Sequence, residues 1–189
     1  PAILEAFASE EPARVELVPL EDGFAGMPTA VFYAVEGLAA HQSPQRLYGR
    51  AAVAAYVEGT EGRLMRSMKS ILGSDLMARS TEVGGGHSVR YFDVIAGYLR
   101  HLKSLAEARA GGPIGRAVIG RPVFFVDEEP ARDAAAQAAL ARAAHEVGFA
   151  EVHFQYEPIA AAFDYEQAWG KAKYEPSSPV PLLLKRAKR

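Results

Sequence analysis

The chain has 189 residues, 49% of them hydrophobic, so it can bury a core as one domain or as one lobe of a larger one. Its net charge of −2 predicts neither nucleic acid nor an acidic membrane surface as a partner. Because it contains no cysteine, disulfides and thiolate metal sites are excluded, and we expect a reducing, cytoplasmic location. The apolar runs are shorter than a membrane span, and the start at Pro1 is expected of a processed or excised piece.

The first part of the chain alternates between extended and irregular patterns. Residues 3–7 fit a short element of undefined type. Alternating side chains predict strands over residues 15–20 and 29–34, and Asp22-Gly23 predicts a turn between them. Residues 37–44 predict a loop.

A short extended piece and a helix come next. Residues 46–49 are extended, and the alanine-rich residues 50–58 predict a helix that Gly59 closes. Residues 64–73 fit neither pattern clearly, and they carry Lys69 between two apolar positions. Taken by itself, Lys69 is interpreted as a solvated side chain whose apolar stem covers the surface.

Three consecutive glycines, Gly84-Gly85-Gly86, predict a flexible hairpin tip. They are not a phosphate loop, because such a loop joins a hydrophobic strand to a helix N-terminus and these follow Arg-Ser-Thr-Glu. The next segment predicts an amphipathic helix that residues 111–113 end, with a buried stripe of Phe92, Ile95, Leu99, Leu102 and Ala106. His101 on this helix is interpreted as an exposed or capping imidazole, and the five histidines show no metal-ligand spacing.

The second half of the chain has a strand, helix, strand pattern. Residues 117–119 begin a buried strand, Gly120-Arg121-Pro122 interrupts it, and residues 123–126 continue it. The polar residues 127–130 open a long helix that Gly148 ends with a left-handed cap, and its inner stripe is predicted to be Ala136, Leu140, Ala143 and Val147. The short joins predict a right-handed crossover between two parallel strands, so the fold class is α/β.

The second of these strands leads directly to an acidic residue. Residues 152–156 alternate as a strand, and Glu157-Pro158 ends it and begins a helix, because proline suits the first helical position. A carboxylate at the carboxyl end of a strand and the positive end of a helix lies where open α/β sheets place their chemistry. Glu157 is therefore a candidate site residue, and the alternative is an acid that only stabilises the start of the helix.

These patterns together resemble the DnaK-type chaperones (the heat shock protein 70 family), in the first lobe of their actin-like ATPase domain. The family has a strand ending in proline, a helix, and then Glu-Pro-x-Ala-Ala-Ala. Here Ile119-Gly-Arg-Pro and Phe154-Gln-Tyr-Glu-Pro are similar to the divergent bacterial YegD-like branch. The likeness covers Val15 to Glu166. Three upstream pieces follow in the family's order: Met27-Pro-Thr-Ala-Val-Phe, Tyr48-Gly-Arg-Ala and Ser67-Met-Lys-Ser-Ile-Leu-Gly73.

The resemblance implies roles for three residues. Lys69 matches the family lysine that contacts the γ-phosphate and the attacking water, where a cation stabilises charge on the transferred phosphoryl group. Glu157 matches the carboxylate that orients water and the hydrated Mg²⁺ ion, through water rather than as a direct metal ligand. Pro122 matches the proline that relays the nucleotide state to the partner domain, although a strand-end proline explains the same position. The family's crossover-helix arginines have no clean counterpart, because alanines and Gln137 stand there and Arg132 is a loose substitute.

The family's two phosphate loops have no counterpart in this sequence. Residues 1–16 do not resemble the Asp-x-Gly-Thr loop, and residues 167–181 stand in place of the strand and the Asp-x-Gly-Gly-Gly-Thr loop. We therefore expect residues 1–166 to be a partial nucleotide-binding lobe of the actin-like ATPase (ribonuclease H-like) fold, an incomplete mixed sheet with flanking helices. Residues 167–189 are expected to be a polar and basic tail or a truncated continuation.

The resemblance implies that the chain is part of the ATP-binding and ATP-hydrolysing domain of a DnaK-type chaperone-like protein. It would need the missing remainder of that ATPase domain to hold ATP and Mg²⁺, and unfolded-protein clients or co-chaperones are its implied partners. One alternative is a non-catalytic binding or scaffold module with the same fold. Another is a different actin-like ATPase, such as a sugar kinase or a filament protein, which shares the fold but not the Gly-Arg-Pro and Tyr-Glu-Pro-x-Ala-Ala-Ala combination.

Overall fold

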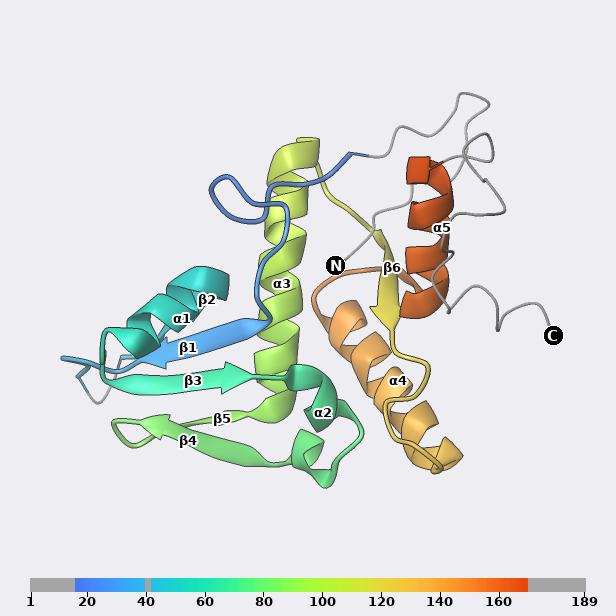
Figure 1. Ribbon diagram of the computed structural model, residues 1–189. Coiled ribbons are helices and arrows are strands. Elements are labelled where there is room, and N and C mark those ends of the chain that lie inside the picture. Colours follow the sequence, from blue (N-terminus) through green and yellow to red (C-terminus); the bar gives the residue numbers. More distant parts are fainter. Residues whose placement is uncertain (1–15, 40–41, 170–189) are drawn as a thin grey trace.

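The structure is a computed structural model that describes residues 16–39 and 42–169. Its helices and strands alternate along the chain (Figure 1). In order they are β1 (Ala30–Ala34), β2 (Gln45–Tyr48), α1 (Gly49–Val57), β3 (Gly62–Arg66), α2 (Met68–Leu72), the 3₁₀ turn η1 (Asp75–Ala78), β4 (Ser80–Gly84), β5 (His87–Arg90), α3 (Tyr91–Ala110), β6 (Arg116–Arg121), α4 (Pro130–Glu146), β7 (Glu151–Tyr156) and α5 (Glu157–Trp169). This mixture of helices and small sheets confirms the α/β class at that level.

Strand β1 is the centre of an antiparallel sheet with the order β2-β1-β3. Its residues are apolar and almost fully buried, and Phe32 at its middle has no exposed surface. Residues 37–39 and 42–44 before β2 form no helix or strand, as expected of the predicted loop. The chain continues from β2 directly into α1, as the sequence predicted. α1 packs on β1 through Ala52 and Ala55, whose small side chains let the helix lie close to the sheet.

Strands β4 and β5 form a separate hairpin beside this sheet. Gly85 and Gly86 are at its tip with φ values of +58° and +75°, a region that L side chains rarely adopt. The prediction of a hairpin tip is therefore confirmed, and these glycines precede a strand and not a helix.

Helix α3 stands between the antiparallel strands on one side and the β6, α4 and α5 elements on the other (Figure 1). It ends before Gly111, as the sequence predicted, and the φ of +72° at Gly111 makes a left-handed cap. In the predicted stripe Ile95 and Ala106 are buried, while Phe92, Leu99 and Leu102 are partly buried against the main core. The buried surface of α3 is wider than predicted, because Val94, Ala96 and Tyr98 also enter it.

Strands β6 and β7 pair in parallel, with Arg116 opposite Glu151 and Arg121 opposite Tyr156. Helix α4 connects them, which confirms the predicted crossover unit, and all four residues of its predicted inner stripe are buried. Three alanines of α4 pack against α3 and the core: Ala136, Ala139 and Ala143. Gly148 follows with φ of +95° and donates its N–H to the carbonyl of His145, as expected of a helix cap.

Three predictions about strands are wrong. Residues 16–20 form no strand, because they pair with no strand in the described part of the chain, and Leu17 is 78% exposed. Residues 123–126 do not continue β6, since β7 ends at Tyr156 opposite Arg121 and offers no partner beyond it. The expected mixed sheet is also absent from the described part of the chain, where parallel and antiparallel strands lie in separate sheets.

The interpretation of His101 as exposed or capping is also wrong. Its ring stacks on Tyr48, with centroids 4.1 Å apart and planes 6° from parallel. Partial burial lowers the pKa of His101 from its usual 6.5, while the charge of the Glu21 carboxylate opposes the shift.

Two further points concern the predicted segments that lie outside the described residues and the search for a membrane-spanning helix. Residues 3–7, the start at Pro1 and most of the predicted tail over 167–189 lie outside the described residues, although α5 continues through Trp169. Within residues 16–39 and 42–169, no helix has the length and apolar character needed to span a bilayer.

Candidate functional site

Lys69 and Glu157, which are 88 residues apart in the sequence, meet in the structure. The Lys69 ammonium donates a hydrogen bond to Oε1 of Glu157, and the two groups form an ion pair. Both remain open to solvent, with 59% of the Lys69 side chain and 37% of the Glu157 side chain exposed. The structure therefore places the two predicted site residues together at an accessible surface.

Glu157 reaches this position because a strand and a helix join without a loop. β7 ends at Tyr156, α5 begins at Glu157, and Pro158 occupies a position where no helical N–H is required. The carboxylate thus lies at the positive end of the α5 dipole, an electrostatically favourable place for an acidic side chain. The helix start predicted from the sequence is confirmed at the residue level.

Lys69 is carried by the short helix α2, which sits immediately after β3. Ser67 before the helix has a left-handed φ of +55°, so the chain turns sharply out of the strand. At the other end, Gly73 lies so close to Val126 that an added Cβ would be 2.2 Å from that side chain. Arg132 of α4 donates a hydrogen bond of 2.8 Å to the Gly73 carbonyl. These contacts fix the α2 end against α4 and the segment after β6.

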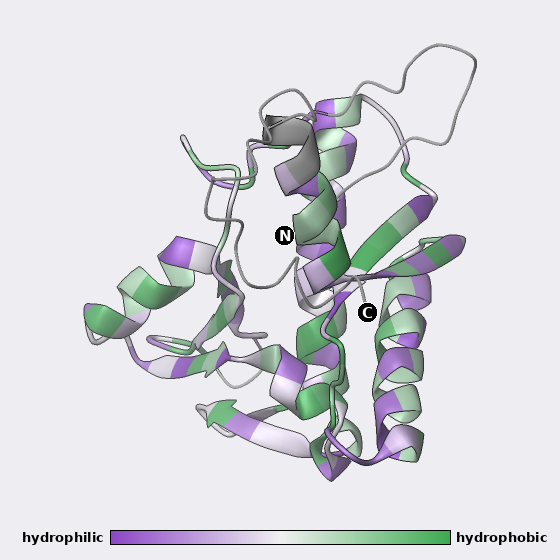
Figure 2. Ribbon diagram, turned by 45° about the vertical axis from the view of Figure 1, so that its right-hand side comes forward, coloured by the Kyte–Doolittle hydropathy of each residue, from purple (hydrophilic) through white to green (hydrophobic). Residues whose placement is uncertain are grey.

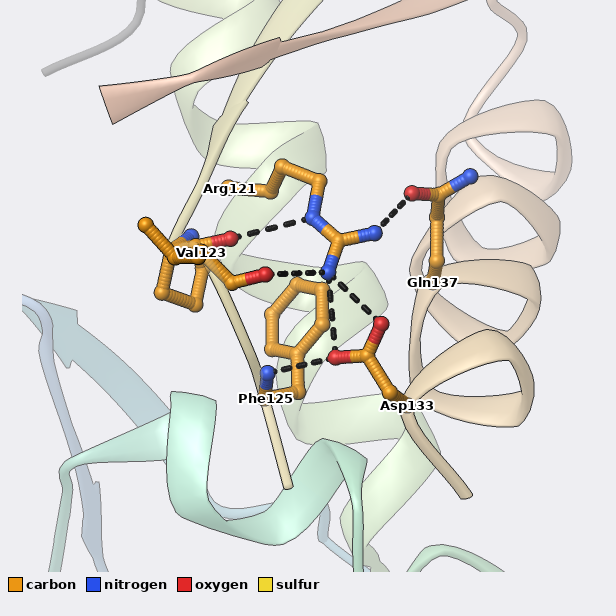
Figure 3. A network of polar contacts seen from close by, with 6 residues as sticks. Arg121, Val123, Phe125, Asp133 and Gln137 are labelled. Atoms are coloured by element: carbon orange, nitrogen blue, oxygen red, sulfur yellow. Dashed lines mark hydrogen bonds and ion pairs between the residues drawn. The ribbon is translucent and has the colours of Figure 1, made fainter. Parts of the chain in front are cut away.

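Pro122 does not contact the Lys69–Glu157 pair through any interaction found in the described residues, but it belongs to a buried polar network beside it (Figure 3). The centre of the network is Arg121, which is only 6% exposed. Arg121 donates through Nε to the Pro122 carbonyl at 3.0 Å and through Nη2 to the Val123 carbonyl at 3.1 Å. The same guanidinium binds both carboxylate oxygens of Asp133, at 2.8 and 3.0 Å, and the amide oxygen of Gln137.

Asp133 completes this network from the first turn of α4. Its carboxylate also accepts the backbone N–H of Phe125 at 2.6 Å. The bonds from Arg121 and then from this N–H hold the pKa of Asp133 below its ordinary value of 3.8. Because both partners are charged and hydrogen-bonded, the network holds the segment from Pro122 to Phe125 firmly on α4.

The Arg121 guanidinium also contacts two aromatic rings, one of which is next to Glu157 in the sequence. Its guanidinium carbon is 5.1 Å from the ring centroid of Tyr156, the residue before Glu157, and 5.1 Å from that of Phe125. Strand alternation explains the first contact, because Arg121 and Tyr156 are opposite each other in the parallel pair and project from the same face.

Sequence reasoning missed Arg121 and Asp133. It treated Gly120-Arg121-Pro122 as an interruption of a strand and as part of a family motif, gave the Arg121 side chain no role, and searched the crossover helix for a cation. The structure has the opposite arrangement, with the cation on β6 and the acceptors Asp133 and Gln137 on α4. The available signal was Asp133 in the first helical turn, an acid placed twelve residues after an arginine at a strand end.

The Lys69 ammonium and the Glu157 carboxylate fit one side of a magnesium–phosphate group. Two side chains are too few to surround such a group. An exposed ammonium suits phosphate oxygens, and a single carboxylate suits a metal-bound water rather than a bare ion. In the described part of the chain, no three histidine or acidic side chains gather to hold a metal ion directly.

A comparison of the chain with models of known protein families finds no match.

Proposed function

We propose that this chain is part of the ATP-binding and ATP-hydrolysing domain of a DnaK-type chaperone-like protein. The observation that carries the proposal is the contact between Lys69 and Glu157. The family resemblance assigns these two residues to one catalytic centre, although they are far apart in the sequence and in different elements. Their meeting supports the assignment, because nothing in the local sequence patterns requires it.

Stability alone is a weak explanation for this pair. An ion pair between exposed groups contributes less than about 1 kcal/mol, because water competes for both charges. Both side chains here are well exposed, and each lies at an end of its own element. What favours a site is the position of Glu157, at the carboxyl end of β7 where open α/β sheets place their chemistry.

The proposed roles follow from the chemistry of the two side chains. In the complete domain, Lys69 releases Glu157 and binds phosphate oxygens, so that its charge stabilises the transferred phosphoryl group. Glu157 then accepts hydrogen bonds from water and orients it for attack, and the magnesium ion bound with ATP would neutralise charge on the phosphates. Further groups for the nucleotide would come from the rest of the ATPase domain.

Pro122 is proposed to report the state of this centre to a partner domain. The support is its place in the network, since its carbonyl accepts from Arg121, which in turn contacts Tyr156 beside Glu157. A change at Glu157 can therefore reach the Pro122 segment through two contacts. In the complete protein, unfolded-protein clients or co-chaperones would be the partners.

The experiment has two stages. Calorimetry with Mg-ATP on the 189-residue chain should show no tight binding, and micromolar or better affinity would refute the incomplete-lobe proposal. In a longer protein that includes both phosphate loops, Lys69→Ala and Glu157→Ala should each reduce hydrolysis far more than ATP binding. Arg109→Ala, which removes a similarly exposed ion pair with Glu16, is the matched control and should leave turnover unchanged.

The two stages separate the proposal from the alternative of a non-catalytic binding or scaffold module. That module would bind no ATP even in the longer protein. Unchanged turnover in both site variants would instead leave an ATPase whose chemistry lies elsewhere.

A further inference from the structure

An exposed apolar surface extends from the end of the parallel sheet along α5. We call it the α5 strip and define it by Val123, Phe124, Tyr156, Ile159 and Phe163. These side chains are 49%, 59%, 43%, 46% and 61% exposed, respectively. Most of the exposed large apolar side chains of the described chain lie on β7, on α5 or in the segment after β6, and Figure 2 shows hydrophobic bands along α5.

The parts of the strip lie together because of the strand register. Arg121 pairs with Tyr156, so the segment that begins at Pro122 and the helix that begins at Glu157 leave the same edge of the sheet. Ile159 and Phe163 are four residues apart on α5 and therefore share one face of the helix. Apolar groups gathered in this way mark an interaction surface more often than chance exposure does.

Acidic residues border one end of the strip. Asp127 and Glu128 follow Phe124 closely, both are exposed, and Glu128 has a left-handed φ of +60° that turns the chain here. No ion pair involves either carboxylate among the interactions found within the described residues. The surface thus offers an apolar strip followed by negative charge.

The chain itself contains a segment of complementary composition that begins ten residues after the end of α5. Residues 180–184 are Val-Pro-Leu-Leu-Leu, and residues 185–189 contain four basic side chains in five positions. We propose that residues 180–184 dock on the α5 strip and that residues 185–189 bind the acidic turn at Asp127 and Glu128. The inference rests on this complementarity and does not depend on the proposed nucleotide chemistry.

The length of the chain allows this path. α5 has 13 residues and so extends ~20 Å, at about 1.5 Å per residue. Residues 170–179 are enough to span up to ~33 Å when extended, at about 3.3 Å per residue. The chain can therefore return along α5 from its end towards Glu157. The apolar segment then meets Phe163 and Ile159 before the basic residues reach the acidic turn, which is the order in the sequence.

Docking in this direction has a consequence for the candidate site. The strip ends beside Glu157, so the basic residues would lie next to the Lys69–Glu157 pair. The segment would then cover a surface that a partner domain or protein would need to contact.

Paramagnetic relaxation in solution tests the proposal with the whole chain. Because the protein has no cysteine, Ala187→Cys gives one attachment point for a spin label among the basic residues. We expect loss of amide signal intensity at residues 123–128 and 157–163, with little loss on α1. Signal loss that is no greater at these residues than on α1 would overturn the proposal.

Two controls identify the occupant. Mixing isotope-labelled chain with spin-labelled, unlabelled chain should produce no signal loss, and a loss of equal size there would assign the strip to a second copy instead. The double variant Phe124→Ser, Phe163→Ser should abolish the effect. Val57→Ser, which removes a 76% exposed apolar side chain on α1, is the matched control and should preserve it. An effect unchanged in the double variant would also overturn the proposal.

Discussion

The Arg121 network allows a quantitative test of the fold around the candidate site through the substitution Arg121→Met. Methionine has a similar length and apolar character to the arginine stem, so packing is largely preserved. What disappears is the set of hydrogen bonds to Pro122, Val123, Asp133 and Gln137. The variant therefore isolates the contribution of the guanidinium group.

The expected loss can be estimated from burial and from the partners left behind. Removing one member of a buried ion pair costs about 3–5 kcal/mol, because the remaining groups stay buried without a partner. Arg121 is 6% exposed, which places it in this class. Val123 is 49% exposed, so water can replace one of the lost bonds, and we expect the lower end, about 3 kcal/mol.

Urea unfolding followed by far-ultraviolet circular dichroism measures this loss at neutral pH. The pKa of Asp133 is held below 3.8 mainly by Arg121, so its native carboxylate binds a proton less readily than the unfolded chain does. The stability that the Asp133 carboxylate contributes is therefore present above pH 3.8. It is lost as the pH falls through the lower pKa that Asp133 has in the folded protein. The difference between wild type and Arg121→Met should accordingly narrow in acid.

A matched surface pair provides the control. Arg90 binds both oxygens of Asp93 at 2.8 Å, but its side chain is 62% exposed. Arg90→Met should cause no measurable loss of stability. A loss below about 1 kcal/mol for Arg121→Met, the range of exposed pairs, would refute the view that burial makes the network important.

Three further predictions concern packing and pH. Gly73→Ala should destabilise the chain by about 1–3 kcal/mol in urea unfolding, because its Cβ would overlap Val126; a neutral effect would mean that the α2 end is free to shift. Ala143→Leu should cost a similar amount, about 1–3 kcal/mol, since Ala143 has no exposed surface in the core that α4 shares with α3, and an unchanged urea midpoint would contradict this. The imidazole of His101 should titrate below 6.5 by NMR, so stability should fall as the pH drops through 6.5. That slope should flatten in His101→Phe, and a titration midpoint above 6.5 would contradict the burial explanation.

Local periodicity was sufficient for the crossover unit in the second half of the fold. The crossover from β6 through α4 to β7 follows from short joins, the stripe that includes Leu140, and the cap at Gly148. These signals are local, and each one agrees with the others. The start of α5 at Glu157 follows for the same reason.

Predictions failed where the outcome depends on distant partners. Residues 16–20 have strand periodicity, but a strand forms only with a partner, and these residues pair with no strand in the described part of the chain. His101 looks like a surface residue on its helix until Tyr48, 53 residues earlier, stacks on it. The segment after Pro122 has β-branched and aromatic residues, yet β7 ends opposite Arg121. Strand propensity shows that a segment can adopt the extended conformation, but whether it forms a strand depends on pairing with another strand.

The same reasoning applies to the candidate site, where Lys69 was selected by resemblance and not by pattern. Along α4, the crossover-helix arginines of the DnaK-type family that the sequence resembles have no clean counterpart, and Arg132 is a loose substitute. A hydrogen bond, however, can be built from either side of an interface, and here the guanidinium comes from Arg121 while the acceptors Asp133 and Gln137 come from the helix. Under the proposed function, if the connection matters and the position of the arginine does not, Arg121→Met in a longer protein that includes both phosphate loops should weaken the response to nucleotide while hydrolysis continues. Equal losses of response and hydrolysis would mean that the network only stabilises the lobe.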